Sequence, residues 1–259
     1  MRTGFRQLFQ ALQDLCFPRS CLLCGTGLPD SPAILLCPPC FATLRLVEEP
    51  LCRCCGRAFR YAAAGNHLCA NCLPPSRWCF SRVRSLLVYN ESAAHLIHGF
   101  KYGGKTTALS TFAALKHLYL PPDALEIPEI IVPVPLHPKR LRERGFNQAL
   151  FLAKSFFPKE RGKIAVNLLR RSRWTEPQTT LSGEARRKNL RGAFALPEPR
   201  LVQGKKVLLI DDVYTTGTTL NLCAQTLLEA GAAEAQALTL ARVEEPSQRH
   251  WQDRLRRLQ

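Results

Sequence analysis

A pair of acidic residues followed by a threonine-rich turn is the part of this sequence that points most directly to chemistry. In Val207–Leu220 an apolar run precedes Asp211 and Asp212, and a segment of helical periodicity follows the turn. The turn residues that would face a ligand are Thr215, Thr216, Gly217, Thr218 and Thr219. Backbone N–H groups at the start of a helix bind phosphate, glycine permits close approach, and hydroxyls add donors. Carboxylates at the end of a buried strand can accept hydrogen bonds from ribose hydroxyls or hold Mg²⁺ through its water.

The same segment can also be an ordinary connection in which the threonines only cap the helix. An Asp-Asp pair alone would be a weak signal, but the combination with Thr-Thr-Gly-x-Thr is much rarer. The sequence contains neither GxGxxG nor GxxxxGK[ST], so a dinucleotide or ATP site is disfavoured. We therefore expect a sugar-phosphate site.

Paired cysteines are the second chemical signal, and 11 of the 12 cysteines lie before residue 80. Two residues between cysteines allow both thiolates to bind one ion, and two such pairs complete a tetrahedral Zn²⁺ shell. The CxxC pairs are Cys21/Cys24, Cys37/Cys40, Cys52/Cys55 and Cys69/Cys72. Consecutive pairs predict two structural zinc sites, with Gly25 and Gly56 at positions that favour a positive φ. A redox site or loose core thiols are the alternatives, and Cys54 or His67 could replace a ligand of the second site.

The positive charge of the chain, +16 overall, is concentrated in one stretch. Residues 139–192 contain 15 Lys or Arg against 4 Asp or Glu. Such a field attracts polyanions, either a pyrophosphate group or a nucleic-acid backbone, although a solvated basic face is the simpler explanation.

Hydrophobic periodicity predicts an α/β fold from about residue 81 onward. The expected strands are Val83–Tyr89, Ile130–Val134, Lys206–Asp212 and Ala235–Ala241. The expected helices are Ser92–Lys101, Thr106–Leu120, a helix with Phe146, Ala149, Leu150, Ala153, Phe156 and Phe157 on one face, and Thr218–Ala230. Alternating strands and helices favour a mostly parallel sheet with helices on both faces. Arg170–Gly192 has no clear period, which indicates a long functional loop or a solvated basic helix at 183–191.

Two domains follow from the change in composition: an N-terminal helix and zinc module over residues 1–80, and the α/β domain over residues 81–259. The first residues predict an amphipathic helix with Phe5, Leu8, Phe9, Leu12 and Leu15 on one side. The sequence has no apolar run of membrane-spanning length and no secretory signal, so we expect a cytoplasmic protein without a membrane partner.

The Val207–Leu220 segment resembles the phosphoribosyl pyrophosphate signature of type I phosphoribosyltransferases. Three further stretches, Leu96–Lys105, Ile131–Gln148 and Pro177–Phe194, resemble the ComF family of competence-associated proteins. With the cysteine module, the resemblance covers essentially the whole chain in the same order. It implies a type I phosphoribosyltransferase fold preceded by a double zinc ribbon.

The resemblance also implies roles for particular residues. Asp211 and Asp212 would hold the ribose hydroxyls, and Thr215–Thr219 would hold the 5-phosphate of phosphoribosyl pyrophosphate, with Mg²⁺. Lys139, Arg140 and Arg144 would form the pyrophosphate loop, and Arg186 and Arg187 would lie on a mobile loop that closes over the ligand. The same arginines could instead contact DNA phosphates.

Three functions are compatible with these features. The first is a ComF-type protein of DNA uptake that binds phosphoribosyl pyrophosphate and single-stranded DNA, with a competence helicase as a candidate partner. The second is an active phosphoribosyltransferase of nucleotide metabolism, for which no general base or other catalytic residue is evident. The third is a regulator that senses phosphoribosyl pyrophosphate.

Overall fold

A computed structural model describes residues 19–29, 33–59, 65–73, 78–102, 107–171 and 193–244 of the chain. The expected N-terminal helix and most of the Arg170–Gly192 loop lie outside these residues. Arg186 and Arg187 are therefore not described. Within the described ranges no helix is both long and apolar enough to span a membrane.

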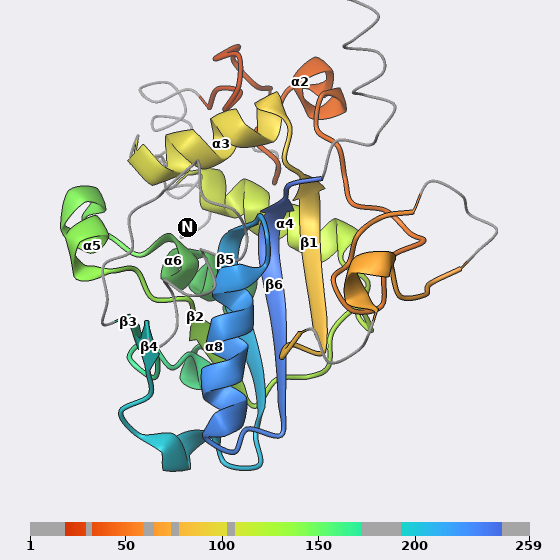
Figure 1. Ribbon diagram of the computed structural model, residues 1–259. Coiled ribbons are helices and arrows are strands. Elements are labelled where there is room, and N and C mark those ends of the chain that lie inside the picture. The colour runs from red at the N-terminus through yellow and green to blue at the C-terminus, as the bar shows by residue number, and fades with distance from the viewer. Residues whose placement is uncertain are drawn as a thin grey trace, which may run out of the picture.

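A four-stranded, fully parallel sheet forms the centre of the molecule, with the strand order β1-β6-β5-β2 (Figure 1). Its strands are β1 (Arg82–Val88), β2 (Ile130–Pro133), β5 (Lys206–Tyr214) and β6 (Glu234–Arg242). The interiors of these strands are almost continuously apolar because helices or loops cover both faces of the sheet. This arrangement confirms the predicted α/β fold with a mostly parallel sheet.

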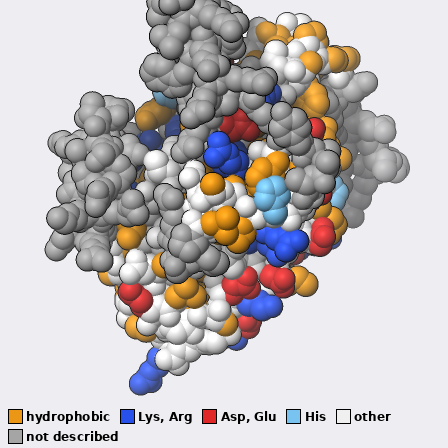
Figure 2. Space-filling model, turned by 45° about the vertical axis from the view of Figure 1, so that its right-hand side comes forward, with side chains coloured by type: hydrophobic (Ala, Val, Ile, Leu, Met, Phe, Trp, Pro, Cys, Tyr) orange, Lys and Arg blue, Asp and Glu red, His pale blue; other side chains and the backbone are white. Residues whose placement is uncertain are grey.

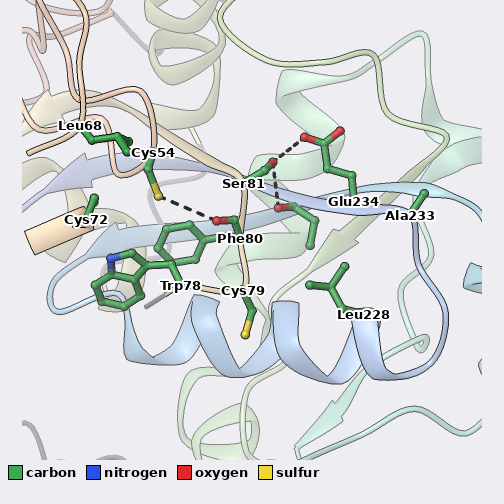
Figure 3. A pocket seen from close by; sticks show the side chains of 11 residues that line it. Cys54, Leu68, Cys72, Trp78, Cys79, Phe80, Ser81, Leu228, Ala233 and Glu234 are labelled. Atoms are coloured by element: carbon green, nitrogen blue, oxygen red, sulfur yellow. Dashed lines mark hydrogen bonds between the residues drawn. The ribbon is translucent and has the colours of Figure 1, made fainter. Parts of the chain in front are cut away.

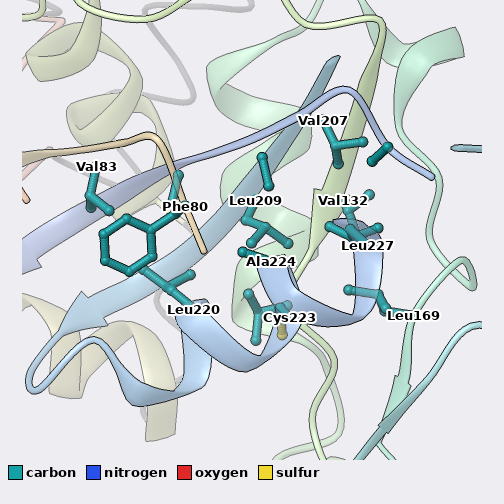
Figure 4. Close-up of a cluster of buried hydrophobic side chains, with 14 of the residues drawn as sticks. Phe80, Val83, Val132, Leu169, Val207, Leu209, Leu220, Cys223, Ala224 and Leu227 are labelled. Atoms are coloured by element: carbon teal, nitrogen blue, oxygen red, sulfur yellow. The ribbon is translucent and has the colours of Figure 1, made fainter. Parts of the chain in front are cut away.

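Helices pack on both faces of the sheet. Figure 1 shows α8 (Thr218–Glu229) in front of the strands, with α4 (Ala108–Tyr119) and α6 (Gln148–Phe156) behind them. The helix α3 (Glu91–Tyr102) belongs to the same hydrophobic cluster as α4 and α6, and it lies above the carboxyl ends of the strands. On the other face, α8 presents its apolar side to the sheet, where Leu220, Cys223 and Leu227 lie close to Leu209 and Val132 (Figure 4).

Shorter elements connect this framework. They are α2 (Pro38–Ala42), the 3-10 turns η2 (Ala70–Cys72), η4 (Arg161–Lys163) and η5 (Pro199–Val202), the helix α5 (Pro138–Arg144), and the antiparallel pair β3 (Arg170–Arg171) and β4 (Phe194–Ala195). The stretch after β2 was expected to be a basic loop, but it forms the single short helix α5. Pro138 at the first position favours this helix because its fixed φ suits a helix start.

Most element boundaries differ by one or two residues from the expectation, and two of these differences bear on the site. The helix predicted to include Phe146 begins only at Gln148, because the Asn147 side chain caps it by accepting a hydrogen bond from Ala149 N. Its buried face contains Leu152 in place of the expected Leu150, at helical spacing from Ala149, Ala153 and Phe156. The strand expected to end at Asp212 continues to Tyr214.

The segment between the two cysteine groups runs along the free side of β1. Leu46 forms an antiparallel bridge with Leu87, and the backbone N–H of Val47 donates to Leu86 O at 2.9 Å. At the other side of the sheet, Ala165 N donates to Ile131 O of β2 at 2.9 Å. The cysteine-rich part is thus joined to the α/β part by backbone hydrogen bonds.

Candidate functional site

The turn between β5 and α8 has the conformation that the sequence predicted for a phosphate site. Gly217 is the N-cap of α8 with φ of 77°, and no side chain caps the first turn of the helix. A Cβ atom at Gly217 would lie 2.6 Å from the Tyr214 hydroxyl, so glycine is required by contact as well as by backbone conformation. Thr215 and Thr216 are exposed, and the Thr216 and Thr218 hydroxyls lie 2.9 Å apart. The helix start therefore offers backbone N–H groups and hydroxyls to an anion.

The two carboxylates of the Asp-Asp pair point to different surroundings. Asp212 forms an ion pair with Lys101 at the end of α3, with 2.5 Å between Nζ and Oδ2. Asp211 lies two residues beyond Leu209 and so shares its sheet face, which α8 covers. Its Oδ1 accepts a hydrogen bond from Asp212 N at 2.9 Å.

Burial, and after it the neighbouring Asp212 carboxylate, raise the pKa of Asp211 to about 7. The Asp212 N–H, Lys101 and Arg171 act in the opposite direction. A carboxyl group with this pKa is close to half ionised near neutral pH, so a small change in its surroundings alters its charge.

The basic residues after β2 divide into two groups. Arg144 turns toward α3 and α6: it donates to the Tyr102 hydroxyl at 3.0 Å and to Gln148 Oε1 at 3.1 Å. Arg140 lies near Arg171, which in turn interacts with Asp211, while Lys139 is exposed on α5. The structure thus links Arg140 to the carboxylate edge of β5 through Arg171, and it holds Arg144 by contacts within the protein.

Three contributors to this site were missed or left without a role at the level of sequence. Lys101 occurs in the Leu96–Lys105 stretch that carried the family resemblance, but nothing there indicated its pairing with Asp212. Arg171 was placed in a loop, whereas it ends a short strand close to Asp211. His137 was given no role, but its Nδ1 caps α5 by accepting from Lys139 N at 3.2 Å.

The eight cysteines of the CxxC pairs form two compact groups. We call Cys21, Cys24, Cys37 and Cys40 the first cysteine group, and Cys52, Cys55, Cys69 and Cys72 the second cysteine group; the ligand atoms within each lie within 4.8 Å of one another. The sulfur atoms of Cys24 and Cys37 are 3.6 Å apart, and those of Cys55 and Cys69 are 3.7 Å apart. A tetrahedral shell with Zn–S bonds of about 2.3 Å separates its sulfur atoms by about 3.8 Å. Both groups therefore fit a structural zinc ion with no open coordination position.

Neither alternative ligand joins the second cysteine group. The His67 ring stacks on Phe59 with 3.9 Å between ring centroids, and its Nδ1 lies 3.1 Å from Gly65 O. Cys54 directs its sulfur toward Phe80 O at 3.9 Å. Gly25 and Gly56 have φ of 77° and 69°, which confirms the positive φ predicted for both.

A cavity of about 310 Å³ lies away from the β5 edge, between the second cysteine group and the start of β6 (Figure 3). Trp78 and Phe80 line it with stacked rings 5.1 Å apart, and Leu228 closes it from α8. Its polar lining is largely satisfied internally, since Ser81 Oγ donates to Glu234 Oε1 at 2.5 Å. This cavity therefore offers little to a phosphorylated ligand.

Two family models match the chain in the order that the structure shows. A double zinc ribbon domain matches residues 12–73, and a phosphoribosyl transferase domain matches residues 145–255. The chain is thus a phosphoribosyltransferase-domain protein with an N-terminal double zinc ribbon.

Curated relatives extend the similarity over most of the chain. The DNA utilization protein YhgH of Escherichia coli (strain K12) is 34% identical over 223 residues, which are 80% of this chain and 96% of that protein. Competence protein F of Haemophilus influenzae is 34% identical over 80% of this chain and 90% of its own length. Competence protein ComFC of Streptococcus pneumoniae is 28% identical over 86% of this chain and 99% of its own length. The chain belongs to the ComF family.

Two solved structures are similar to about half of the chain. An allosteric regulatory enzyme of purine biosynthesis is 20% identical with a TM-score of 0.31, over 52% of this chain and 25% of its own. A purine phosphoribosyltransferase from Pyrococcus horikoshii is 14% identical with a TM-score of 0.30, over 54% of this chain and 89% of its own. The family membership rests on the domain matches and the curated relatives, not on these structures.

Proposed function

We propose that this protein binds phosphoribosyl pyrophosphate, or a related ribose phosphate, at the β5–α8 turn, and that it handles single-stranded DNA during DNA uptake in the cytoplasm. The 5-phosphate would lie at the N-terminus of α8, against Thr215–Thr219. The ribose hydroxyls would donate to Asp211 and Asp212, and a Mg²⁺ ion would be held by one carboxylate together with phosphate oxygens. In this proposal residues 1–80 form the zinc-binding domain and residues 81–259 the ligand-binding domain.

The observation that carries the proposal is the uncapped helix start at Gly217 next to two carboxylates on the same strand. A helix start alone would bind many anions. The adjacent carboxylates favour an anion that also carries hydroxyl groups, because a second phosphate group near them would be repelled unless a cation lay between. A ribose 5-phosphate unit has this combination of groups.

The positive charges of Lys101 and Arg171 offset the negative charges of Asp212 and Asp211. Lys101 pairs with Asp212, and Arg171 lowers the cost of ionising Asp211. A pyrophosphate group bound beside this edge would add negative charge, for which Lys139 and Arg140 of α5 would be the counter-charges. Arg144 would position this loop through its contacts with Tyr102 and Gln148.

The DNA-binding part of the proposal rests on the names of the relatives, DNA utilization and competence proteins, and on the overall charge of +16. The face in Figure 2 is not a continuous basic area, because acidic and basic side chains lie next to one another on it. We therefore expect binding to be weak and strongly salt-dependent. A titration of labelled single-stranded DNA at several salt concentrations measures both properties, and affinity that does not change with salt would contradict a phosphate-contacting surface.

Calorimetry with ribose 5-phosphate and with phosphoribosyl pyrophosphate, each with and without Mg²⁺, tests the ligand site. Replacing Asp212 by Asn should lower the affinity for either ligand at least tenfold, because hydrogen bonds to a charged acceptor contribute about 1.5–3 kcal/mol. Glu129→Gln is the matched control: Glu129 pairs with Lys205 at the exposed opposite end of the sheet. Equal affinities of both variants and the unmodified protein would refute the assignment of Asp212.

Transferase activity is tested separately from ligand binding. Incubation of phosphoribosyl pyrophosphate and Mg²⁺ with a panel of purine and pyrimidine bases would release pyrophosphate if the protein transfers the ribose phosphate. We expect the protein to bind phosphoribosyl pyrophosphate without releasing pyrophosphate. Among the described residues of the site, Asp211 is the one candidate for a general base. Base-dependent release of pyrophosphate would make the protein an enzyme.

A further inference from the structure

Arg242, the last residue of β6, is a charged side chain in an unusual position. It is only 4% exposed, although charged residues are seldom fully buried without a partner of opposite charge. Within the described part of the chain no carboxylate pairs with it. Its Nη1 instead donates to the backbone carbonyl of Cys55 at 2.7 Å.

The second cysteine group supplies the missing negative charge. Four thiolates around one Zn²⁺ carry a net charge of −2, and Cys55 is one of the four. The guanidinium of Arg242 therefore lies against an anionic metal site, to which it is tied by the Cys55 carbonyl. This contact explains why a buried arginine is tolerated at the end of a central strand.

The same guanidinium also lies over the Tyr214 ring. The distance from Arg242 Cζ to the centroid of the Tyr214 ring is 5.2 Å, within the range of a cation–π contact. The two residues are direct neighbours in the pairing of β5 with β6, and Val243 N donates to Tyr214 O at 2.8 Å. The position of the Tyr214 ring is thus fixed by the residue that binds the second cysteine group.

Tyr214 in turn contacts the proposed phosphate turn. Its hydroxyl would lie only 2.6 Å from a Cβ placed on Gly217, the N-cap of α8. The ring is buried at 6% exposure and packs edge-on against Phe80, so it has little room to move. A continuous series of contacts therefore runs from Cys55 through Arg242 and Tyr214 to Gly217.

We propose that Arg242 is a positioning residue that couples the second zinc site to the β5–α8 turn, so that metal occupancy and ribose phosphate affinity depend on each other. The coupling rests on the ligand site proposed above. By thermodynamic reciprocity, a ligand that binds more tightly when the second site holds zinc must also strengthen zinc binding by the same factor.

Arg84 provides a matched control for Arg242. It projects from β1, and its Nη1 donates to Val83 O at 2.8 Å and lies 3.5 Å from Cys52 O, next to the same metal site. It has no contact with Tyr214 among the interactions of the described residues. Substitution of either arginine by Lys keeps the positive charge but removes the planar group that can stack on a ring and donate in a fixed direction.

The first experiment measures ribose 5-phosphate binding by calorimetry in the zinc-loaded full-length protein, with metal content checked for every sample. Arg242→Lys should lower the affinity about fivefold or more at full metal content, whereas Arg84→Lys should change it less than twofold. Equal affinities in the two variants would overturn the coupling. If Asp212→Asn still weakened binding in that case, the ligand site itself would stand.

The second experiment uses the unmodified protein and so does not depend on the folding of Arg242→Lys. A chromogenic chelator competes for the metal at equilibrium, with and without saturating ribose 5-phosphate. The ligand should raise the affinity for one ion, and this increase should persist in Cys24→Ser, in which the first cysteine group is broken. Metal affinities that do not change with the ligand would overturn the coupling. Absence of any ribose 5-phosphate binding to the unmodified protein would remove both the ligand site and the coupling.

Discussion

The two cysteine groups have the same CxxC spacing, yet they belong to different hydrophobic clusters and differ in burial. In the first cysteine group Cys21 is buried, Cys37 and Cys40 are partly exposed, and Cys24 is exposed. All four residues of the second cysteine group are at most 6% exposed. The first group packs with α3, α4 and α6, whereas the second belongs to the cluster that α8 covers.

This difference shows that a local motif determines metal binding but not the consequences of losing the metal. Four thiolates at this spacing can bind zinc wherever they lie. The second cysteine group also contributes buried surface to the main core and contacts Arg242, so its metal supports the packing around α8. The first group supports a more exposed part of the molecule.

We expect the largest difference between the two cysteine groups when one cysteine ligand is removed from each and the free energy of unfolding is compared. Cys55→Ser should lower the free energy of unfolding by at least about 4 kcal/mol, because metal binding energy at a structural site is folding energy and the side chain is buried. Cys24→Ser, at the same position of the exposed first site, should cost about 1–2 kcal/mol. Urea unfolding followed by circular dichroism, together with the metal content, measures both. Equal losses would mean that the two sites are integrated to the same degree.

The glycines that follow these cysteines allow a finer comparison. Both Gly25 and Gly56 have a positive φ, which costs a residue with a side chain about 1–2 kcal/mol. A Cβ at Gly25 would meet nothing within 4 Å, but one at Gly56 would lie 2.5 Å from the Val83 carbonyl oxygen. We therefore expect Gly25→Ala to cost about 1 kcal/mol and Gly56→Ala about 3 kcal/mol. Similar losses in thermal unfolding would show that Val83 moves aside easily.

The last comparison concerns the Asp211 carboxylate, whose effect depends on pH and disappears in acid. Because the pKa of Asp211 is raised to about 7, the folded protein binds more protons than the unfolded chain between pH 4 and pH 7. Its contribution is therefore stabilising at low pH and is lost as the pH rises through about 7. Partial exposure reduces the effect, so Asp211→Asn should be more stable than the unmodified protein by about 2 kcal/mol at pH 8, with little gain at pH 4. Unfolding measured at both pH values checks this, and a gain that does not vary with pH would contradict it.

Local signals predicted much of this structure. The four strands of the sheet and the helix after Gly217 follow from apolar runs and their periodicity, with ends displaced by one or two residues. The cysteine groups and the positive φ of Gly25 and Gly56 follow from spacing alone, because a metal knuckle is formed by neighbouring residues. The turn at Gly217 was predicted for the same reason.

The contacts that connect these local features were not predictable from the sequence. Arg242 reaches Cys55 across 187 positions, and Lys101 reaches Asp212 from a different helix. Such pairs depend on the order of the strands and on where each helix packs against the sheet. Neither can be read from a short sequence motif. The burial of Arg242 could not be foreseen, because a charged residue at a strand end normally faces solvent.

The pairing of residues 45–47 with β1, and of Ala165 with β2, has a further consequence for the chain as a whole. An unpaired outer strand of a sheet is a template on which other chains can add and aggregate. Here both outer strands are capped by backbone of the same molecule, and on the β1 side that backbone comes from the cysteine-rich part. A fragment beginning near residue 81 would leave this side of β1 without its backbone partners, so we expect the cysteine-rich part also to oppose self-association.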